Sequence, residues 1–508
     1  MCVAYIHVRM RIRVRDSSGK PATGVACRVQ TWHATSLSAN SPTRSAAKGH
    51  AQKIKPKNRT FAASLMDNKK FSFLLSHIFE VANPIFYEQK PADLALHYFF
   101  KNKKYLGASD RRIISETLYQ AIRTLPRTEL LLKQHQLGDN LIVPVCIYHI
   151  LSQNFKSSEV QQCFTEKFRY PEHLWQKIHD ALQTEYQPVS EIESIAYHTA
   201  FPVWFVEELS KTFSIAETVQ ILTILNQNAN VHLRVNTYLT NIESVMEALK
   251  KEGIHTHKGN ISPESLIIDK RKPIFATQTF KQGLIELQDE GSQLVAWLVN
   301  PKAGKTVLDA CAGGGGKTLH LATLMKGKGT VFAYEVNPER FGNIKQRIRR
   351  SQLQNIQLLD SKEKFEKFTQ KYTEQIDYVL VDAPCSASGT LRRNPDLKLR
   401  LKKEQVDALP HVQLDILQKY QKFVRKGGRL VYVTCSVFEC ENKAVVEKFL
   451  SLNPEFKCVP VCEVVKEIKL PVDLSALQKL TENQTYLNLL PHQQDTDGFF
   501  VAVLERAN

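Results

Sequence analysis

The chain has 508 residues, of which 43% are hydrophobic and 23% are charged. This composition is typical of a globular protein, and the length suggests about three domains. It excludes a wholly disordered chain, and because no run of about 18 apolar residues occurs, we expect no membrane-spanning helix. The ten cysteines are scattered and form no C-x2-C pairs, so we expect no structural metal and a reducing, cytoplasmic compartment.

The formal net charge of +17 indicates an anionic partner, nucleic acid before a membrane. The charge is unevenly distributed, because residues 1–65 hold twelve Lys or Arg and one acid. That segment accounts for +11, which leaves +6 for residues 66–508, so the remainder is only mildly basic. Three interpretations of residues 1–65 stay open: a start placed too early, a disordered basic tail, and a targeting segment.

The predicted elements begin with a helical domain over residues 66–190. Apolar residues recur there at helical spacing, and Ser109 or Asp110 is placed to cap a helix. The apolar face of that helix comprises Ile114, Leu118, Ile122 and Leu125. Taken alone, this periodicity indicates a helical bundle with an apolar core and no chemistry.

Residues 194–285 mix helices with short strands, which predicts a small α+β module. A strand over 231–236 places Arg234 and Asn236 on one face, where they meet either a ligand or solvent. From residue 286 to residue 508, apolar strands alternate with helical stretches, which is the pattern of a parallel α/β sheet.

The first strong functional signal is a glycine-rich loop. The strand over 306–309 ends in Asp309 and leads into the glycines 313–316 and then a helix. Glycines allow backbone amides to approach a ligand closely. A Walker A phosphate loop is excluded because Cys311 stands where that motif needs glycine, and the dinucleotide motif fails at Thr318. The loop therefore predicts a nucleotide-like ligand bound without a phosphate cradle.

Acidic residues also follow the next two predicted strands, at Glu335 and Asp360. An acid at such a strand end suits the hydroxyls of a ribose. Three acids around a glycine loop favour a cofactor with ribose and adenine but no phosphate, and S-adenosylmethionine fits this description. The predicted cofactor-binding residues are Asp309, Cys311, Ala312, Gly313, Gly314, Gly315, Gly316, Lys317, Glu335, Asp360 and Asp382.

Two further strands each end close to a cysteine. The strand over 377–382 precedes Cys385, and the strand over 429–434 precedes Cys435. Because ligands of open α/β sheets bind at the carboxyl ends of the strands, we expect both thiols beside the cofactor. A single cysteine is most often an inert buried residue, but two at equivalent strand ends indicate chemistry.

Residues 382–396 (DAPCSASGTLRRNPD) resemble motif IV of the RsmB/Sun-type RNA cytosine-5 methyltransferases, and residues 433–437 (VTCSV) resemble their motif VI. The resemblance runs from about residue 71 to the C-terminus. It implies a multi-domain protein with an all-α NusB-like RNA-binding domain (66–190), a small α+β RNA-binding module (194–285) and a Rossmann-like, S-adenosylmethionine-dependent methyltransferase domain (286–508). The chain departs from the family at Gly313–Gly314, where Ala-Pro is usual, and at Glu335, where Asp is usual.

The resemblance implies an RNA (cytosine-5)-methyltransferase that acts on carbon 5 of a cytidine, and the NusB-like domain favours small-subunit ribosomal RNA. Cys435 would attack carbon 6 of the base, Cys385 would assist product release, and Asp382 and Lys317 would support the chemistry. We expect a monomer with RNA as partner and no metal. The predicted RNA-binding residues are Arg234, Arg392 and Arg393.

Two alternatives stay open, a transfer RNA cytosine-5 methyltransferase and an inactive RNA-binding or assembly protein. A DNA cytosine-5 methyltransferase is disfavoured, because such enzymes take the nucleophile from the Pro-Cys motif and follow it with Gln. Here Ser386 follows Cys385, and Cys435 supplies a second thiol.

Overall fold

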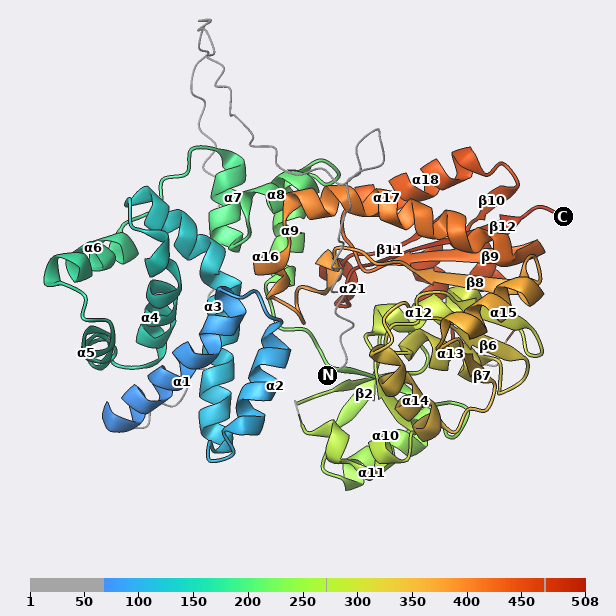
Figure 1. The fold of residues 1–508 in the computed structure, drawn as a ribbon, viewed down its shortest axis with the longest axis horizontal. Helices are drawn as coiled ribbons and strands as arrows, with labels where there is room; N and C mark the ends of the chain where they lie inside the picture. The colour runs from blue at the N-terminus through green and yellow to red at the C-terminus, as the bar shows by residue number, and fades with distance from the viewer. Residues whose placement is uncertain (1–67, 271, 470–471) are drawn as a thin grey trace, which may run out of the picture. The chain divides into compact units, whose positions relative to one another are not determined.

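The structure, a computed structural model, describes residues 68–270, 272–469 and 472–508. A helical region, a small antiparallel sheet and a larger, mostly parallel sheet follow one another along the chain (Figure 1). This arrangement confirms the predicted multi-domain fold class. The interpretations of residues 1–65 fall outside the described residues.

The N-terminal helices pack around the long helix α3. Ile114, Leu118 and Ile122 on α3 are fully buried, so the predicted apolar face is the packed one. The helix begins at Ala108 and its N-cap is Gly107, so the prediction that Ser109 or Asp110 caps it is wrong by two or three residues. Asp110 lies in the first turn and accepts a hydrogen bond from the backbone N–H of Gly107 (3.3 Å). The elements are α1 (Asn68–Phe86), α2 (Ala92–Asn102), α3 (Ala108–Gln134), α4 (Ile142–Asn154), α5 (Ser157–Phe168) and α6 (Glu172–Gln183).

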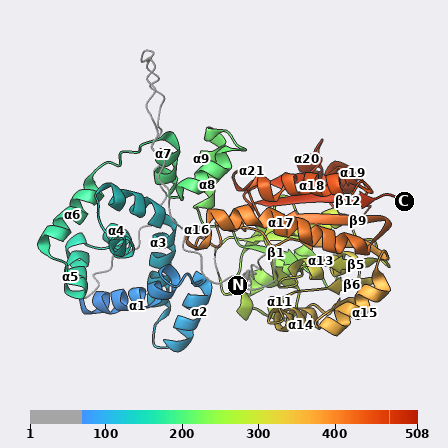
Figure 2. The same ribbon diagram turned by 45° about the horizontal axis from the view of Figure 1, so that its top comes forward.

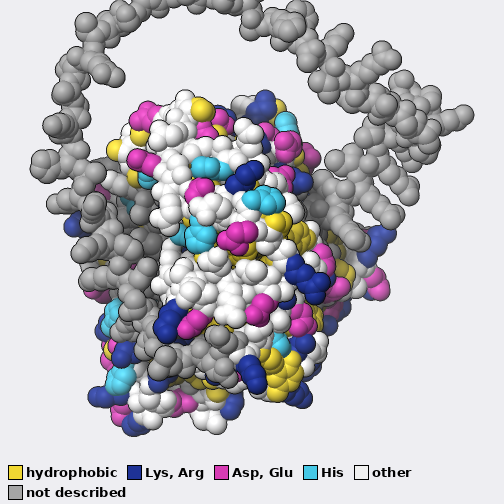
Figure 3. Space-filling model, turned by 90° about the vertical axis from the view of Figure 1, so that its left-hand side faces the viewer, with side chains coloured by type: hydrophobic (Ala, Val, Ile, Leu, Met, Phe, Trp, Pro, Cys, Tyr) yellow, Lys and Arg dark blue, Asp and Glu magenta, His cyan; other side chains and the backbone are white. Residues whose placement is uncertain are grey.

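On the face of the molecule drawn in Figure 3, basic and acidic side chains of the described residues are interspersed. The described residues in view on this face therefore present no patch of a single charge, and this visible part gives no direct support to RNA binding.

Three short helices link the N-terminal helices to the sheets. They are α7 (Glu191–Thr199), α8 (Val203–Ser210) and α9 (Ile215–Leu225). Ser190 and Ser214 cap α7 and α9 by accepting hydrogen bonds from the backbone N–H groups three residues later. Phe201, between α7 and α8, and Phe205 on α8 pack with Leu391 and Phe438 in one apolar cluster. Leu391 and Phe438 follow the strands that precede Cys385 and Cys435.

The small sheet is antiparallel, with strand order β2-β3-β1-β4. One face packs on α10, through buried residues such as Leu233, Val235, Val245 and Leu249. All four residues of β1 are buried, so both of its faces are covered. The elements are β1 (His232–Val235), α10 (Ile242–Lys251), β2 (Thr256–Lys258), β3 (Ser265–Ile268), α11 (Gln278–Lys281) and β4 (Ile285–Leu287).

The large sheet has the strand order β10-β12-β9-β8-β5-β6-β7, with β11 paired to β12. Strands β5 to β9 are parallel, and β12 runs antiparallel to β9. The strands are β5 (Thr306–Asp309), β6 (Thr330–Ala333), β7 (Ile356–Leu358), β8 (Ile376–Asp382), β9 (Val424–Thr434), β10 (Phe456–Val459), β11 (Leu487–Leu489) and β12 (Phe499–Arg506).

Helices cover both faces of this sheet, as Figure 2 shows. Successive strand residues alternate between the two cores: Val431 and Val433 face one side, Leu430 and Tyr432 the other. The core on one side of the sheet contains α12 (Glu290–Val299), α13 (Gly316–Leu324), α19 (Val461–Lys466) and α20 (Ser475–Thr481). The core on the other side contains α15 (Lys362–Tyr372), α17 (Lys403–Tyr420) and α18 (Lys443–Leu452). Helix α14 (Arg340–Ser351) follows β6.

The chain reverses its direction of travel across the sheet beside β5. From β5 it moves outward through β6 and β7, and then returns to place β8 and β9 on the other side. Ligands of open α/β sheets bind at the carboxyl edge at such a reversal. The topology therefore directs attention to the residues that follow β5, β8 and β9.

Candidate active site

Two neighbouring parallel strands bring the predicted catalytic cysteines together. β8 and β9 are paired in a register that sets Asp382 opposite Val433, so the residues after each strand emerge at the same edge. The Sγ atoms of Cys385 and Cys435 lie 3.3 Å apart. The backbone N–H of Cys435 also donates to the Cys385 sulfur, at 3.4 Å. The prediction that both thiols lie at one edge agrees with this geometry.

The environment of Cys385 favours its thiol form. The hydrogen bond with Cys435, together with burial and the neighbouring Glu441 carboxylate, raises the pKa of the Cys385 thiol well above its usual range. Two adjacent thiols in one pocket cannot both ionise easily, because the second negative charge is repelled by the first. Cys385 therefore keeps its proton beside Cys435.

A lysine and a carboxylate lie at the same edge. Lys317, near the start of α13, donates a hydrogen bond from Nζ to Asp382 Oδ2 at 2.6 Å, and its side chain is 12% exposed. Burial opposes the charged form of Lys317, but Asp382 outweighs it and Cys435 adds to the effect, so the pKa of Lys317 is raised. The ammonium group is thus held protonated beside the thiols.

The glycine loop is fixed by hydrogen bonds from outside it. Gly315 caps α13 with φ +79°, a backbone conformation that favours glycine. The N–H of Gly313 donates to Glu335 (2.8 Å), and the carbonyl of Gly314 accepts from Arg347 (2.5 Å). The two glycines that depart from the family pattern are therefore both tied to neighbouring elements.

The three predicted acids have different surroundings. Asp309 is buried and accepts from the Thr318 hydroxyl at 2.7 Å, while its Oδ1 atom has no hydrogen-bond partner among the described residues. Burial raises the pKa of Asp309 to about 7, although the Thr318 hydrogen bond opposes this shift. Glu335 forms an ion pair with Arg340, and Asp360 pairs with two lysines, which lower its pKa to about 2.

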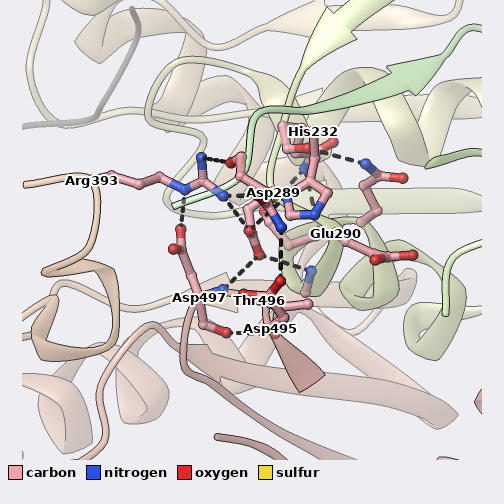
Figure 4. A network of polar contacts seen from close by, with 12 residues as sticks. His232, Asp289, Glu290, Arg393, Asp495, Thr496 and Asp497 are labelled. Carbon is pink, nitrogen blue, oxygen red and sulfur yellow. Dashed lines mark hydrogen bonds and ion pairs between the residues drawn. The ribbon is translucent and has the colours of Figure 1, made fainter. Parts of the chain in front are cut away.

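The arginines predicted to bind RNA have partners inside the protein. Arg393 pairs with Asp289 (2.6 Å) and Asp497 (2.7 Å), in the network of Figure 4. Arg392 is 4% exposed and pairs with Asp495, and Arg234 donates to the carbonyl of Gly316 at 2.8 Å. RNA binding by these three side chains stays a prediction, and their contacts indicate a structural role.

The network around Arg393 joins three parts of the chain. Asp289 lies just before α12 and accepts hydrogen bonds from the backbone N–H groups of Gly291 and Asp497, at 2.8 and 3.2 Å. His232 of β1 lies 3.3 Å from the same carboxylate. Arg393 and His232 lower the pKa of Asp289 despite its burial, while burial raises the pKa of Asp497 to about 6.

Several residues that hold this site in place are absent from the sequence-based predictions. Arg347 on α14 contacts the glycine loop, and Glu441 contacts both cysteine loops. Gln413 contacts Glu441 and the carbonyl of Pro384 in the Cys385 loop. A single sequence does not reveal whether a charged or polar residue in a helix or a turn is buried. The one available signal was the position of Glu441 shortly after the Cys435 motif.

Among residues 68–508, apart from the three undescribed positions, no cluster of His, Cys, Asp or Glu is arranged to hold a metal ion. In the same part of the chain, no helix has the length and apolar character needed to cross a membrane.

Comparisons with known proteins agree with this geometry. A sequence profile described as 16S rRNA methyltransferase RsmB/F matches residues 296–505, and one for an RsmF/B-like ferredoxin-like domain matches residues 201–275. The probable ribosomal RNA small subunit methyltransferase B of Bacillus subtilis is 33% identical over 323 residues, which are 62% of this chain and 68% of that protein. Ribosomal RNA small subunit methyltransferase B of Shewanella oneidensis is 27% identical over 433 residues, 82% of this chain and 96% of that protein.

Solved structures show the same fold. The crystal structure of PH0851 is 26% identical, with a TM-score of 0.68 over 87% of this chain and 99% of that one. A methyltransferase homolog from Pyrococcus horikoshii is 23% identical, with a TM-score of 0.52 over 63% of this chain and 100% of that one, and it supports the fold alone. The predicted family resemblance is confirmed: this chain belongs to the RsmB/F family of 16S rRNA methyltransferases.

Proposed function

We propose that this chain methylates carbon 5 of a cytidine in small-subunit ribosomal RNA, through a covalent bond between Cys435 and the base. The observation that carries the proposal is the pair of thiols 3.3 Å apart, beside the Lys317–Asp382 ion pair, at the carboxyl edge of the large sheet. The names of the curated relatives support ribosomal RNA as the substrate.

The thiol pair suits nucleophilic attack on the base. Carbon 5 of cytosine is a weak nucleophile until conjugation of the ring is broken, and attack by the Cys435 thiolate on carbon 6 achieves this. As the sulfur–carbon bond forms, electron density moves to nitrogen 3. The Lys317–Asp382 pair holds a proton at that edge of the sheet and supplies it to nitrogen 3. The target base must first leave its stack for the thiol to reach it.

Release of the product requires the second cysteine. A proton must leave carbon 5 before the bond between Cys435 and carbon 6 can break, and Cys385 is the adjacent base. Its pKa is raised first by the hydrogen bond to Cys435. Once the Cys435 sulfur is bonded to carbon 6, Cys435 carries no negative charge and no longer forms that hydrogen bond. Cys385 can then lose its own proton to solvent and accept the proton from carbon 5. The proton on nitrogen 3 returns to the Lys317–Asp382 pair.

The residues around the glycine loop fit S-adenosylmethionine. The buried Oδ1 atom of Asp309 lacks a partner among the described residues, and the loop beside it contains no phosphate-binding motif. Asp309, Glu335 and the backbone of residues 311–316 would hold the cofactor. Asp382 ends β8, which neighbours β5, whereas Asp360 follows β7, two strands away from β5 on the other side. When bound, S-adenosylmethionine supplies the methyl group from its sulfonium, and the protein contributes alignment.

The test uses tritiated S-adenosylmethionine and unmodified small-subunit RNA, with wild type, Cys435→Ala and Cys385→Ala in parallel. We expect no methyl transfer by Cys435→Ala, and a protein–RNA adduct stable in denaturing gels with Cys385→Ala. Full activity of Cys435→Ala would refute the nucleophile assignment. Absence of transfer by wild type to any RNA would favour an inactive RNA-binding protein, and preference for transfer RNA would change the substrate.

A further inference from the structure

The loops that carry the two cysteines are joined by one buried carboxylate, that of Glu441, which is fully inaccessible to solvent. Its Oε2 atom accepts the backbone N–H of Ser386 at 2.8 Å, directly after Cys385. Its Oε1 atom accepts the hydroxyl of Ser436 at 2.6 Å, directly after Cys435. Glu441 therefore contacts the residue that follows each of the two thiols.

Serine hydroxyls complete the bridge between the loops. The Oγ atoms of Ser386 and Ser436 lie 3.1 Å apart, and Ser388 Oγ lies 3.0 Å from Ser436 Oγ. Ser388 also accepts the backbone N–H of Val437 at 3.0 Å, and the backbone N–H of Gly389 donates to the carbonyl of Cys435 at 2.9 Å. Each contact crosses from one cysteine loop to the other, so displacement of one loop disturbs the other.

Glu441 is itself held firmly. Tyr432 donates a hydrogen bond to its backbone carbonyl at 2.6 Å, and Gln413 donates from one amide nitrogen to both its Oε2 atom and the carbonyl of Pro384, each at 3.0 Å. No Lys, Arg or His forms an ion pair with Glu441 in the part of the chain that the structure describes. A buried carboxylate without a cation is costly, so its retention calls for a local reason.

We propose that Glu441 is a positioning residue that sets the separation of Cys385 from Cys435 and thereby governs the release half of the reaction. The inference rests on the proposed function. Attack needs Cys435, which continues directly from β9, and the Lys317–Asp382 pair, which α13 and β8 hold. Cys385 instead lies in the loop after Pro384, and the contacts of Glu441 determine how that loop meets Cys435.

Burial explains why a glutamate is suited to this position. Burial raises the pKa of Glu441, and the hydrogen bonds from Ser386, Ser436 and Gln413 oppose that shift. The carboxylate needs both oxygens and its full side-chain length to span the two loops. Reach and charge can therefore be separated by substitution, because Asp keeps the charge and shortens the reach, whereas Gln keeps the reach and removes the charge.

The experiment compares Glu441→Asp, Glu441→Gln and Tyr432→Phe with wild type and Cys385→Ala. Tyr432→Phe is the matched control, because it removes a hydrogen bond to the same turn without changing the carboxylate. Two quantities are measured on small-subunit RNA: methyl transfer in the first turnover, and the fraction of enzyme in a denaturation-stable RNA adduct during multiple turnovers. Thermal unfolding of each variant reports its folded fraction.

We expect Glu441→Asp to retain first-turnover transfer and to accumulate adduct, with multiple turnover slowed on the order of 10- to 100-fold, since a displacement of ~1 Å can cost that much. Glu441→Gln should restore most of the release rate, and Tyr432→Phe should not accumulate adduct. The inference would be overturned if Glu441→Asp lost first-turnover transfer and multiple turnover equally and accumulated no adduct. It would also be overturned if Tyr432→Phe accumulated as much adduct as Glu441→Asp.

If Glu441→Asp does not fold, Ser436→Ala serves the same test, because it removes only the hydroxyl that links the Cys435 loop to the carboxylate. We expect Ser436→Ala to accumulate a larger fraction of adduct than Tyr432→Phe, and equal fractions would refute the inference. A wild type that transfers no methyl group would refute the proposed function itself. A trapped adduct in Cys385→Ala with none in the Glu441 and Ser436 variants would refute the inference alone.

Discussion

Replacement of Arg393 by Met separates a structural role from an RNA-binding one. The guanidinium pairs with Asp289 and Asp497, whose side chains are each 5% exposed. Asp289 would keep two backbone hydrogen bonds and its contact with His232 after the substitution. The Asp497 carboxylate would lose its hydrogen bond, because its Oδ2 atom accepts from Arg393 and its Oδ1 atom has no hydrogen-bond partner among the described residues.

The expected loss of stability follows from this asymmetry. Removal of one partner from a buried ion pair costs about 3–5 kcal/mol, and the stranded Asp497 carboxylate accounts for most of it here. For a domain of roughly 200 residues this corresponds to a fall in Tm of roughly 10 °C. The double variant Arg393→Met/Asp497→Asn removes the stranded charge, so we expect it to recover a large part of the loss.

The pH dependence of the loss provides a second check. Burial already raises the pKa of Asp497 to about 6, above its ordinary value of 3.8, and loss of Arg393 would raise it further. A group with a raised folded-state pKa stabilises the fold fully below its unfolded pKa, and this contribution is lost as pH rises through the folded value. The destabilisation by Arg393→Met should therefore be larger at pH 8 than at pH 5.

Thermal unfolding at both pH values and RNA binding as a function of salt complete the assay, with the exposed Arg349→Met as control. If Arg393 instead binds a phosphate, Arg393→Met should leave Tm unchanged, weaken RNA binding and reduce the salt slope by about 1. That outcome would refute the structural assignment.

Two further predictions concern the glycine loop. Arg347→Ala removes the donor to the Gly314 carbonyl. We therefore expect S-adenosylmethionine to bind about 10-fold more weakly, the equivalent of roughly one charged hydrogen bond, with RNA affinity unchanged. Calorimetry tests this prediction on Arg347→Ala and on Arg349→Ala as control, and equal affinities of the two variants for S-adenosylmethionine would contradict it. Asp309 has a pKa raised by burial from 3.8 to about 7, so its contribution to stability is full below pH 3.8 and lost as pH rises through 7. The Tm of Asp309→Asn minus that of wild type, without cofactor, should therefore increase from pH 5 to pH 8, by the equivalent of about 3 kcal/mol for the two pH units between 5 and the folded-state pKa. A constant difference would show that Asp309 does not titrate in this range.

Much of the candidate site at the carboxyl edge of the large sheet could be predicted because it depends on local sequence. The strands predicted at 306–309 and 377–382 match β5 and β8 within a residue at each end. Apolar alternation identifies each strand, and parallel strands place their following residues at one edge. The proximity of Cys385 and Cys435 follows from that rule once β8 and β9 are neighbours.

The contacts that tie the site to the rest of the protein could not be predicted in the same way. Alternation along β1 correctly separates Arg234 from Leu233 and Val235, but it does not say what covers the polar face. In the structure that face meets the start of α13, where Arg234 donates to the Gly316 carbonyl. Such a contact joins residues 82 positions apart, which no periodicity within one element records.

Net positive charge is therefore a poor measure of RNA-binding surface in this chain. Arg234 and Arg347 hold carbonyls of the glycine loop, Arg393 holds two carboxylates beneath the catalytic loop, and Arg350 pairs with the buried Glu286. These guanidinium groups are already engaged within the protein, and to use one of them for a phosphate would take a partner from a carbonyl of the glycine loop or from a buried carboxylate. Because Arg234 joins β1 to the glycine loop, and Arg347 joins Glu286 of β4 to the same loop, the small sheet helps to hold the glycine loop in place. The RNA surface must therefore be sought among the cations that lack such internal partners.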